Sequence, residues 1–110
     1  MGADKKYEVF FMKKIKSDIL ELPNMGQVTA RKLALIGITT KQQFLDSDPY
    51  ALFAQLLEKV DPTLCRCALG GIIGAHEGKK WNEVRARAAE EFIKRFPKQA
   101  DAFGFSKKKW

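Results

Sequence analysis

Helix-capping residues and prolines divide this chain into short segments, and strand signals are nearly absent. Thr40 is followed three residues later by Gln43, which is the spacing of a capping box that opens a helix. Asp48-Pro49 and Asp61-Pro62 each place a capping carboxylate directly before a proline, which favours the first position of a helix. The pattern predicts an all-α protein of five or six short helices. We expect the first helix to open at Asp18 and end before Pro23, and the others to span about 27–36, 41–46, 49–59, 62–77 and 82–96.

The net charge of +7 is concentrated at the two ends of the chain. Residues 1–16 and residues 97–110 each carry an excess of three positive charges, whereas the longer middle is nearly neutral. We therefore expect a basic N-terminal arm or helix over 1–16, one helical domain over 17–96 and a basic C-terminal tail over 97–110. Basic ends attract polyanions or keep a protein soluble, so charge alone leaves the partner open.

The sequence shows neither a secretory signal nor a membrane span. No stretch approaches the roughly 20 apolar residues that a membrane helix needs, and the apolar run 9–12 is too short for a signal-peptide core. Cys65 and Cys67 are separated by one residue, which is too close for an unstrained disulfide. We expect a cytoplasmic protein with reduced thiols and no membrane contact.

The sequence gives little indication of a metal site, a cofactor site or a catalytic site. Cys65 and Cys67 on a helix would point about 200° apart, and His76 is the sole histidine, so a zinc site lacks ligands. We expect helix-borne core thiols, no metal and no cofactor. No nucleophile–base pair or pair of carboxylates stands out, so we expect no enzymatic activity. The three glycines of residues 70–74 weaken their helix, and we expect them to allow a second helix to approach closely.

The segment 19–33 carries the strongest functional signal. Pro23 ends one helix, Met25 fills the space between two helices, and Gly26 leaves the start of the second helix without a side chain. The first N–H groups of a helix have no partner inside it and lie at the positive end of its dipole, so they form an anion site. The residues expected to hold phosphate are Asn24, Gly26, Gln27, Val28, Thr29, Arg31 and Lys32.

This segment resembles the helix-hairpin-helix motif. The matching residues are Ile19, Leu22, Pro23, Met25, Gly26, Ala30 and Leu33, and the one departure is Asn24, where the family usually has glycine. The stretch 35–45 looks like the continuation found in small proteins of this kind. Residues 67–74 with Trp81 are similar to the C-terminal domain of TfoX-type competence regulators and, less closely, to small pathogenicity-locus proteins. The resemblance covers about 17–85 and implies a bundle of the SAM or helix-hairpin-helix type.

We therefore expect the chain to bind the backbone of double-stranded DNA without reading its sequence. Lys79, Lys80 and Arg85 are expected as secondary contacts, with Trp81 near them. The alternative is a protein–protein adaptor with the same fold and no DNA binding. An exposed patch of Phe10, Phe11, Phe103 and Phe105 would favour that alternative.

Overall fold

A computed structural model describes residues 15–105 of the chain, and every regular element within that range is helical. The prediction of an all-α protein is therefore confirmed. No helix in this range is both long enough and apolar enough to cross a membrane. The elements are a 3₁₀ turn η1 (Asp18–Glu21) and the helices α2 (Gln27–Ala34), α3 (Lys41–Leu45), α4 (Pro49–Lys59), α5 (Arg66–Glu77), α6 (Trp81–Arg95) and α7 (Pro97–Ala102).

The strongest local signals place their helices correctly. Thr40 and Gln43 form the expected capping box at the start of α3, and Asp48 caps α4 with Pro49 at its first position. Gly78 ends α5 in the left-handed conformation, with φ of +74°.

Two expected helix starts differ from the structure, and the first element is capped by another residue. The carboxylate of Asp61 accepts a hydrogen bond from the N–H of Thr63 and forms a local turn, so α5 begins four residues beyond Pro62, with Cys65 as its N-cap. The first element begins at Asp18 as expected, but it is a short 3₁₀ turn with Ser17 as its cap. The last long helix begins at Trp81, one residue before the expected start at residue 82.

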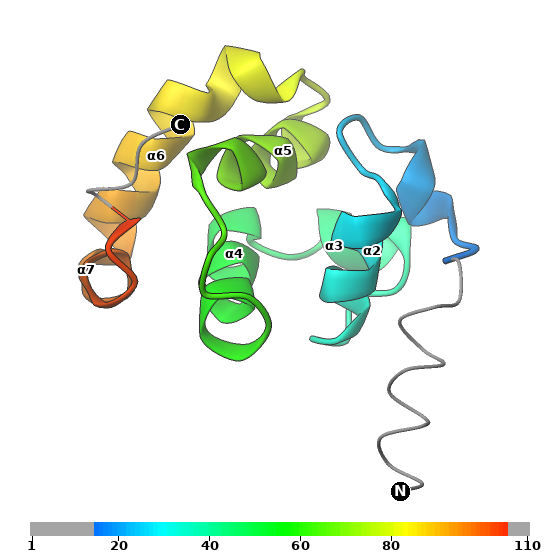
Figure 1. Cartoon of the computed structure of the whole chain (residues 1–110). Coiled ribbons are helices and arrows are strands. Elements are labelled where there is room, and N and C mark those ends of the chain that lie inside the picture. The colour runs from blue at the N-terminus through cyan, green and yellow to red at the C-terminus, as the bar shows by residue number, and fades with distance from the viewer. Residues whose placement is uncertain (1–14, 106–110) are drawn as a thin grey trace, which may run out of the picture.

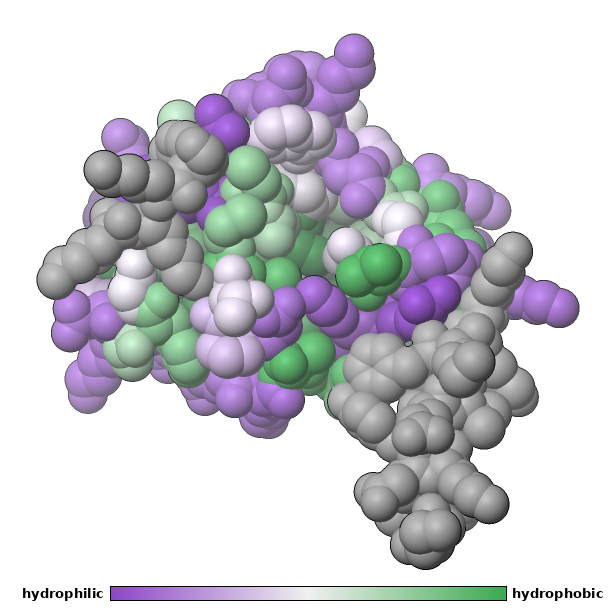
Figure 2. Space-filling view, viewed as in Figure 1, coloured by the Kyte–Doolittle hydropathy of each residue, from purple (hydrophilic) through white to green (hydrophobic). Residues whose placement is uncertain are grey.

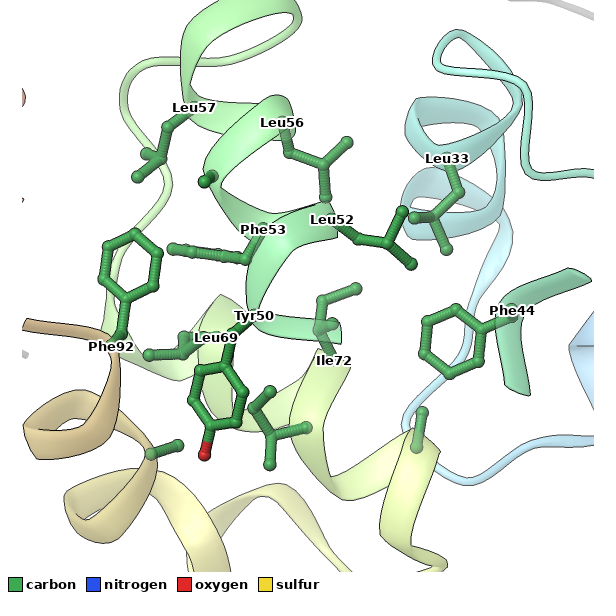
Figure 3. Packing of buried hydrophobic residues seen from close by; sticks show 14 of the residues in the cluster. Leu33, Phe44, Tyr50, Leu52, Phe53, Leu56, Leu57, Leu69, Ile72 and Phe92 are labelled. Carbon is green, nitrogen blue, oxygen red and sulfur yellow. The ribbon is translucent and has the colours of Figure 1, made fainter. Parts of the chain in front are cut away.

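The core lies between α4 and the helices packed around it (Figure 3). Phe53 of α4 and Phe92 of α6 are fully buried, and their rings meet edge to face with centroids 5.2 Å apart. On the other side of α4, Leu52 lies towards Leu33 of α2 and Phe44 of α3. One apolar cluster therefore joins both ends of the described chain, and Figure 1 shows α4 and α5 between the α2–α3 pair and the α6–α7 pair.

The C-terminal segment is not a free tail over its whole length, contrary to expectation. Pro97 opens α7, and Phe105 is fully buried against Phe53 and Phe92 at centroid distances of 5.7 Å and 5.1 Å. Residues 97–105 thus belong to the domain, which extends beyond the expected boundary at 96. The remainder of the expected tail, like the arm over 1–14, lies outside the described residues.

The expected close approach of a second helix is confirmed at Gly70, and Gly74 lies against the loop before that helix. A Cβ placed on Gly70 would lie 2.8 Å from the carbonyl oxygen of Trp81, and one on Gly74 would lie 2.5 Å from that of Lys79. Gly71 differs, because its added Cβ would meet only the Cβ of Asn24, at an ordinary 3.8 Å. Two glycines therefore admit the backbone of α6 and the loop before it, and the third does not.

Candidate nucleic-acid interface

The segment from η1 through α2 is hereafter called the hairpin. Its apolar residues anchor it in the core. Ile19, Met25, Ala30 and Leu33 are all buried, as expected from their spacing. Met25 is buried and belongs to the same apolar cluster as the core of the domain. The turn itself and the first residues of α2 are left at the surface.

Asn24 stands at the tip of the hairpin with φ of +62°, a left-handed conformation that asparagine adopts more readily than most residues. Its side-chain amide donates to the carbonyl oxygen of Lys79 at 2.8 Å and accepts from the N–H of Trp81 at 3.1 Å. Both polar atoms are therefore engaged. The side chain of Asn24, one of the residues expected at phosphate, thus fastens the hairpin to the loop before α6 in this structure.

The start of α2 is open. Gly26 is its N-cap with extended backbone angles, no side chain caps it, and a Cβ added to Gly26 would meet nothing within 4 Å. No hydrogen bond among residues 15–105 uses the N–H groups of Gly26, Gln27 or Val28. No acidic residue lies in the first turn of α2. The backbone arrangement expected for an anion site is therefore present.

Two side chains expected at the phosphate are engaged elsewhere. The amide of Gln27 accepts from the N–H of Ile15 at 2.7 Å and donates to the carbonyl oxygen of Ile15 at 3.1 Å, so it holds the entering chain. The ammonium of Lys32 lies 2.7 Å from a carboxylate oxygen of Asp61. Both side chains therefore have partners other than a phosphate in this structure, while the Gln27 backbone stays at the open helix start.

The other expected residues remain available at or near the hairpin. Val28 has 60% of its surface exposed. Arg31 is half-buried and follows in the same helix, but its Nε is itself buried, without a hydrogen-bond partner within the described part of the chain. Thr29 lines a cavity beside α5. Of the seven residues expected at phosphate, an arrangement compatible with that role is kept by Gly26, Val28, Thr29, Arg31 and the backbone of Gln27.

The structure brings the secondary basic residues to the hairpin. Because Asn24 bonds the backbone of residues 79–81, Lys79 and Lys80 lie on the loop directly beside the turn (Figure 1). Lys79 remains largely exposed, with its ammonium 3.9 Å from Glu77. The guanidinium of Arg85 lies 5.4 Å from the centre of the Trp81 ring. Residues some 55 positions apart in sequence therefore share one surface.

A cavity of about 310 Å³ lies between the hairpin, α5 and the start of α6. Sequence reasoning missed it, because four of its residues come from the N-terminal part of α5, and the resemblance over residues 67–74 does not indicate which of their side chains meet the hairpin. The one available signal was Gly71, because a glycine weakens a helix. Gly70 and Gly74 are needed for close packing, but Gly71 is not. The cavity is lined by Asn24, Thr29, Cys67, Ala68, Gly71, Ile72 and Trp81.

The two cysteines differ from the expected pair of helix-borne core thiols. Cys65 precedes α5 as its N-cap with extended backbone angles, and both cysteines are half-buried. Burial on its own raises the pKa of the Cys65 thiol, but N–H groups of Ala68 and Cys67 and the Cys67 side chain stabilise the thiolate and bring the pKa below its usual value. No cluster of three metal-ligating side chains occurs in residues 15–105.

Comparison with known proteins identifies one family. The model of the family described as Cdd1, pathogenicity locus, matches residues 13–90, which include the hairpin, the cavity and most of α6. No curated protein and no solved structure matches the chain.

Proposed function

This chain belongs to the Cdd1, pathogenicity locus, family, and we propose that it binds the backbone of DNA without sequence preference through its hairpin. The single observation that carries the proposal is the uncapped start of α2. There the N–H groups of Gly26, Gln27 and Val28 have no partner among the described residues, and Gly26 leaves open space above them. Such a helix start attracts a phosphate oxygen through its N–H groups and its dipole.

The surroundings of this helix start also favour an anion. Lys79 and Lys80 lie beside the turn, and Arg31 follows in α2. The chain as a whole carries a net charge of +7, which adds long-range attraction for a polyanion. Contacts of this kind fix the position of a duplex without reading its bases, so we propose a binding protein and not an enzyme.

As the finer part of the proposal, the hairpin is a helix-hairpin-helix motif in which asparagine replaces the usual glycine. The replacement is accommodated because Asn24 takes the left-handed conformation and uses its amide to secure the loop of residues 79–81. We also propose the relationship of α5 and Trp81 to the C-terminal domain of TfoX-type regulators. Both statements rest on the matching residues and on the turn geometry.

Replacing Gly26 by glutamate tests the proposal directly. The new carboxylate would occupy the open space at the helix start and repel phosphate, so we expect affinity for a short duplex to fall at least about tenfold. Fluorescence anisotropy at several salt concentrations measures this, and affinity of the unaltered protein should fall steeply with salt. Ala102→Glu adds the same charge on exposed α7, at the opposite end of the molecule (Figure 1), and is the matched control.

If Ala102→Glu weakens duplex binding as much as Gly26→Glu, the effect is one of net charge. If Gly26→Glu binds the duplex as tightly as the unaltered protein, the hairpin does not take part in binding. Circular dichroism of both variants shows whether the fold is retained.

The adaptor alternative loses part of its basis in the structure. Phe105 is fully buried and Phe103 is half-buried, so these two residues do not form the exposed aromatic patch that would favour this alternative. Phe10 and Phe11 lie outside the described residues. Hydrophobic residues are visible in the middle of the face shown in Figure 2, with hydrophilic ones around them, but no partner is indicated for them.

A further inference from the structure

We propose that the cavity beside the hairpin receives one unpaired nucleobase of the bound DNA. The proposal rests on the proposed function, because the same hairpin would hold the phosphate of that strand. It adds a preference: the protein would bind single-stranded DNA, or a duplex with an extrahelical nucleotide, more tightly than a fully paired duplex.

The position of the cavity is the first argument. Its walls come from the hairpin through Asn24 and Thr29, from α5, and from Trp81 at the start of α6. Thr29 lies three residues after Gly26, which is about 5 Å along the axis of α2. A phosphate at the open helix start and a base in the cavity would therefore be neighbours, as they are within one nucleotide.

The chemistry of the lining is the second argument. Trp81 is 40% exposed although tryptophan is usually buried, and it offers an aromatic surface of the kind on which bases stack. Ala68 and Ile72 supply further apolar wall. Thr29 and Cys67 add a hydroxyl and a thiol that can meet the polar edge of a base. With a volume of about 310 Å³, the cavity is large enough for a single base.

Gly71 is the third argument, because packing does not explain it. Gly70 and Gly74 admit the backbone around α6, but an added Cβ on Gly71 would meet only Asn24, at 3.8 Å. A glycine inside a helix lowers its stability, so a residue without a packing role is expected to be larger. What the missing side chain does preserve is the open volume of the cavity.

Three oligonucleotides of matched length test the inference with the full chain. They are a single strand, a fully paired duplex and the same duplex with one extrahelical nucleotide. We expect the single strand and the bulged duplex to bind about tenfold more tightly than the paired duplex, the order of effect seen for one stacked base. In a Trp110→Phe background, stacking should also quench the fluorescence of Trp81.

Two variants probe the cavity independently. Gly71→Leu fills it from the α5 side, and we expect it to abolish the tenfold advantage and the quenching while leaving affinity for the paired duplex unchanged. Trp81→Ala removes the stacking surface and should also abolish the advantage. Thermal unfolding of each variant verifies that it is folded.

The outcomes separate the two proposals. Binding of all three oligonucleotides with equal affinity overturns the base-binding cavity and leaves backbone binding in place. If both variants still bind the single strand and the bulged duplex more tightly than the paired duplex, the cavity is not the source of that preference. Failure to bind any of the three overturns both proposals.

Discussion

The ion pair between Lys32 and Asp61 fastens α2 to the loop that follows α4. The ammonium of Lys32 lies 2.7 Å from the carboxylate, and both side chains are mostly shielded from water, with 24% and 22% of their surface exposed. The hydrogen bond from Lys32, together with two from Thr63, lowers the pKa of Asp61 to about 2. A side chain expected to hold phosphate thus stabilises the fold that presents the hairpin.

This pair predicts a contribution of Asp61 to acid stability. The pKa is lowered on folding, so the unfolded chain binds more protons between about pH 4 and pH 2. The stabilisation is fully present above pH 4 and is lost as the pH falls through 2. We expect it to be about 1–2 kcal/mol after allowance for the partial exposure of the pair. Urea unfolding of the wild type and Asp61→Asn between pH 5 and pH 2 measures it.

Lys32→Met is the matched control for this titration, because it leaves the bonds from Thr63 in place. It should therefore retain part of the pH dependence that Asp61→Asn loses. If Asp61→Asn and the wild type lose stability in parallel over this range, the lowered pKa of Asp61 does not contribute.

At the same scale, Asn24 shows what a sequence can and cannot predict about a site residue. Its tolerance of left-handed angles is an intrinsic property of asparagine, and Asn24 adopts such angles here. Its partners lie 55 and 57 residues away, and no local pattern indicates such contacts. The same holds for Gln27, because its hydrogen bond to Ile15 depends on the path of the chain before η1. Backbone features of the hairpin were accessible from sequence, and side-chain partners were not.

Among the elements, α5 and α6 depend most directly on glycine. Gly74 sits where the loop carbonyl of Lys79 and the amide of Asn24 would lie 2.5 Å and 2.7 Å from an added Cβ. Neither neighbour can withdraw without loss, because they are hydrogen-bonded to each other. The same residue therefore sets the spacing of α5 and the loop before α6 and leaves room for the link to the hairpin.

We predict opposite effects for alanine at two neighbouring glycines of α5. Gly74→Ala should destabilise the protein by about 2–3 kcal/mol, because backbone or the Asn24 link must shift. Gly71→Ala should stabilise it by up to about 1 kcal/mol, because its Cβ enters ordinary contact and alanine favours helix. Chemical denaturation measures both changes. Similar effects of the two variants would show that the close approach at Gly74 is not limiting.

Helix starts can be predicted from sequence only where the capping residue has no competing partner elsewhere in the fold. The capping box at Thr40 and the Asp48-Pro49 pair involve residues a few positions apart, and both predict their helices correctly. Asp61-Pro62 carries the same signal, but Asp61 caps a local turn at Thr63 and also pairs with Lys32. The competing partner comes from α2, so only the folded structure decides between the two uses.

For the whole molecule, the main departure from expectation is the C-terminal boundary. Lysines and the helix-ending Pro97 indicate a tail, whereas the position of Phe105 is decided by a space between Phe53 and Phe92. Burial of Phe105 and Ala100, together with the hydrogen bonds of α7, offsets the cost of ordering this segment. Charge composition therefore does not reveal where this domain ends, because the buried residues of the segment decide whether it packs.

Phe105→Ala tests this extended boundary. Removal of a fully buried ring from contact with two other buried rings should destabilise the whole domain by about 3–5 kcal/mol. Phe103→Ala is the control, because Phe103 is only half-buried and its loss should cost clearly less. Thermal unfolding followed by far-ultraviolet circular dichroism reports both. Since α7 packs on α4 and α6, which share a core with α2, the loss should appear as one earlier transition of the entire domain. If Phe105→Ala unfolds at the wild-type temperature, residues 97–105 do not contribute to the stability of the domain and are a tail.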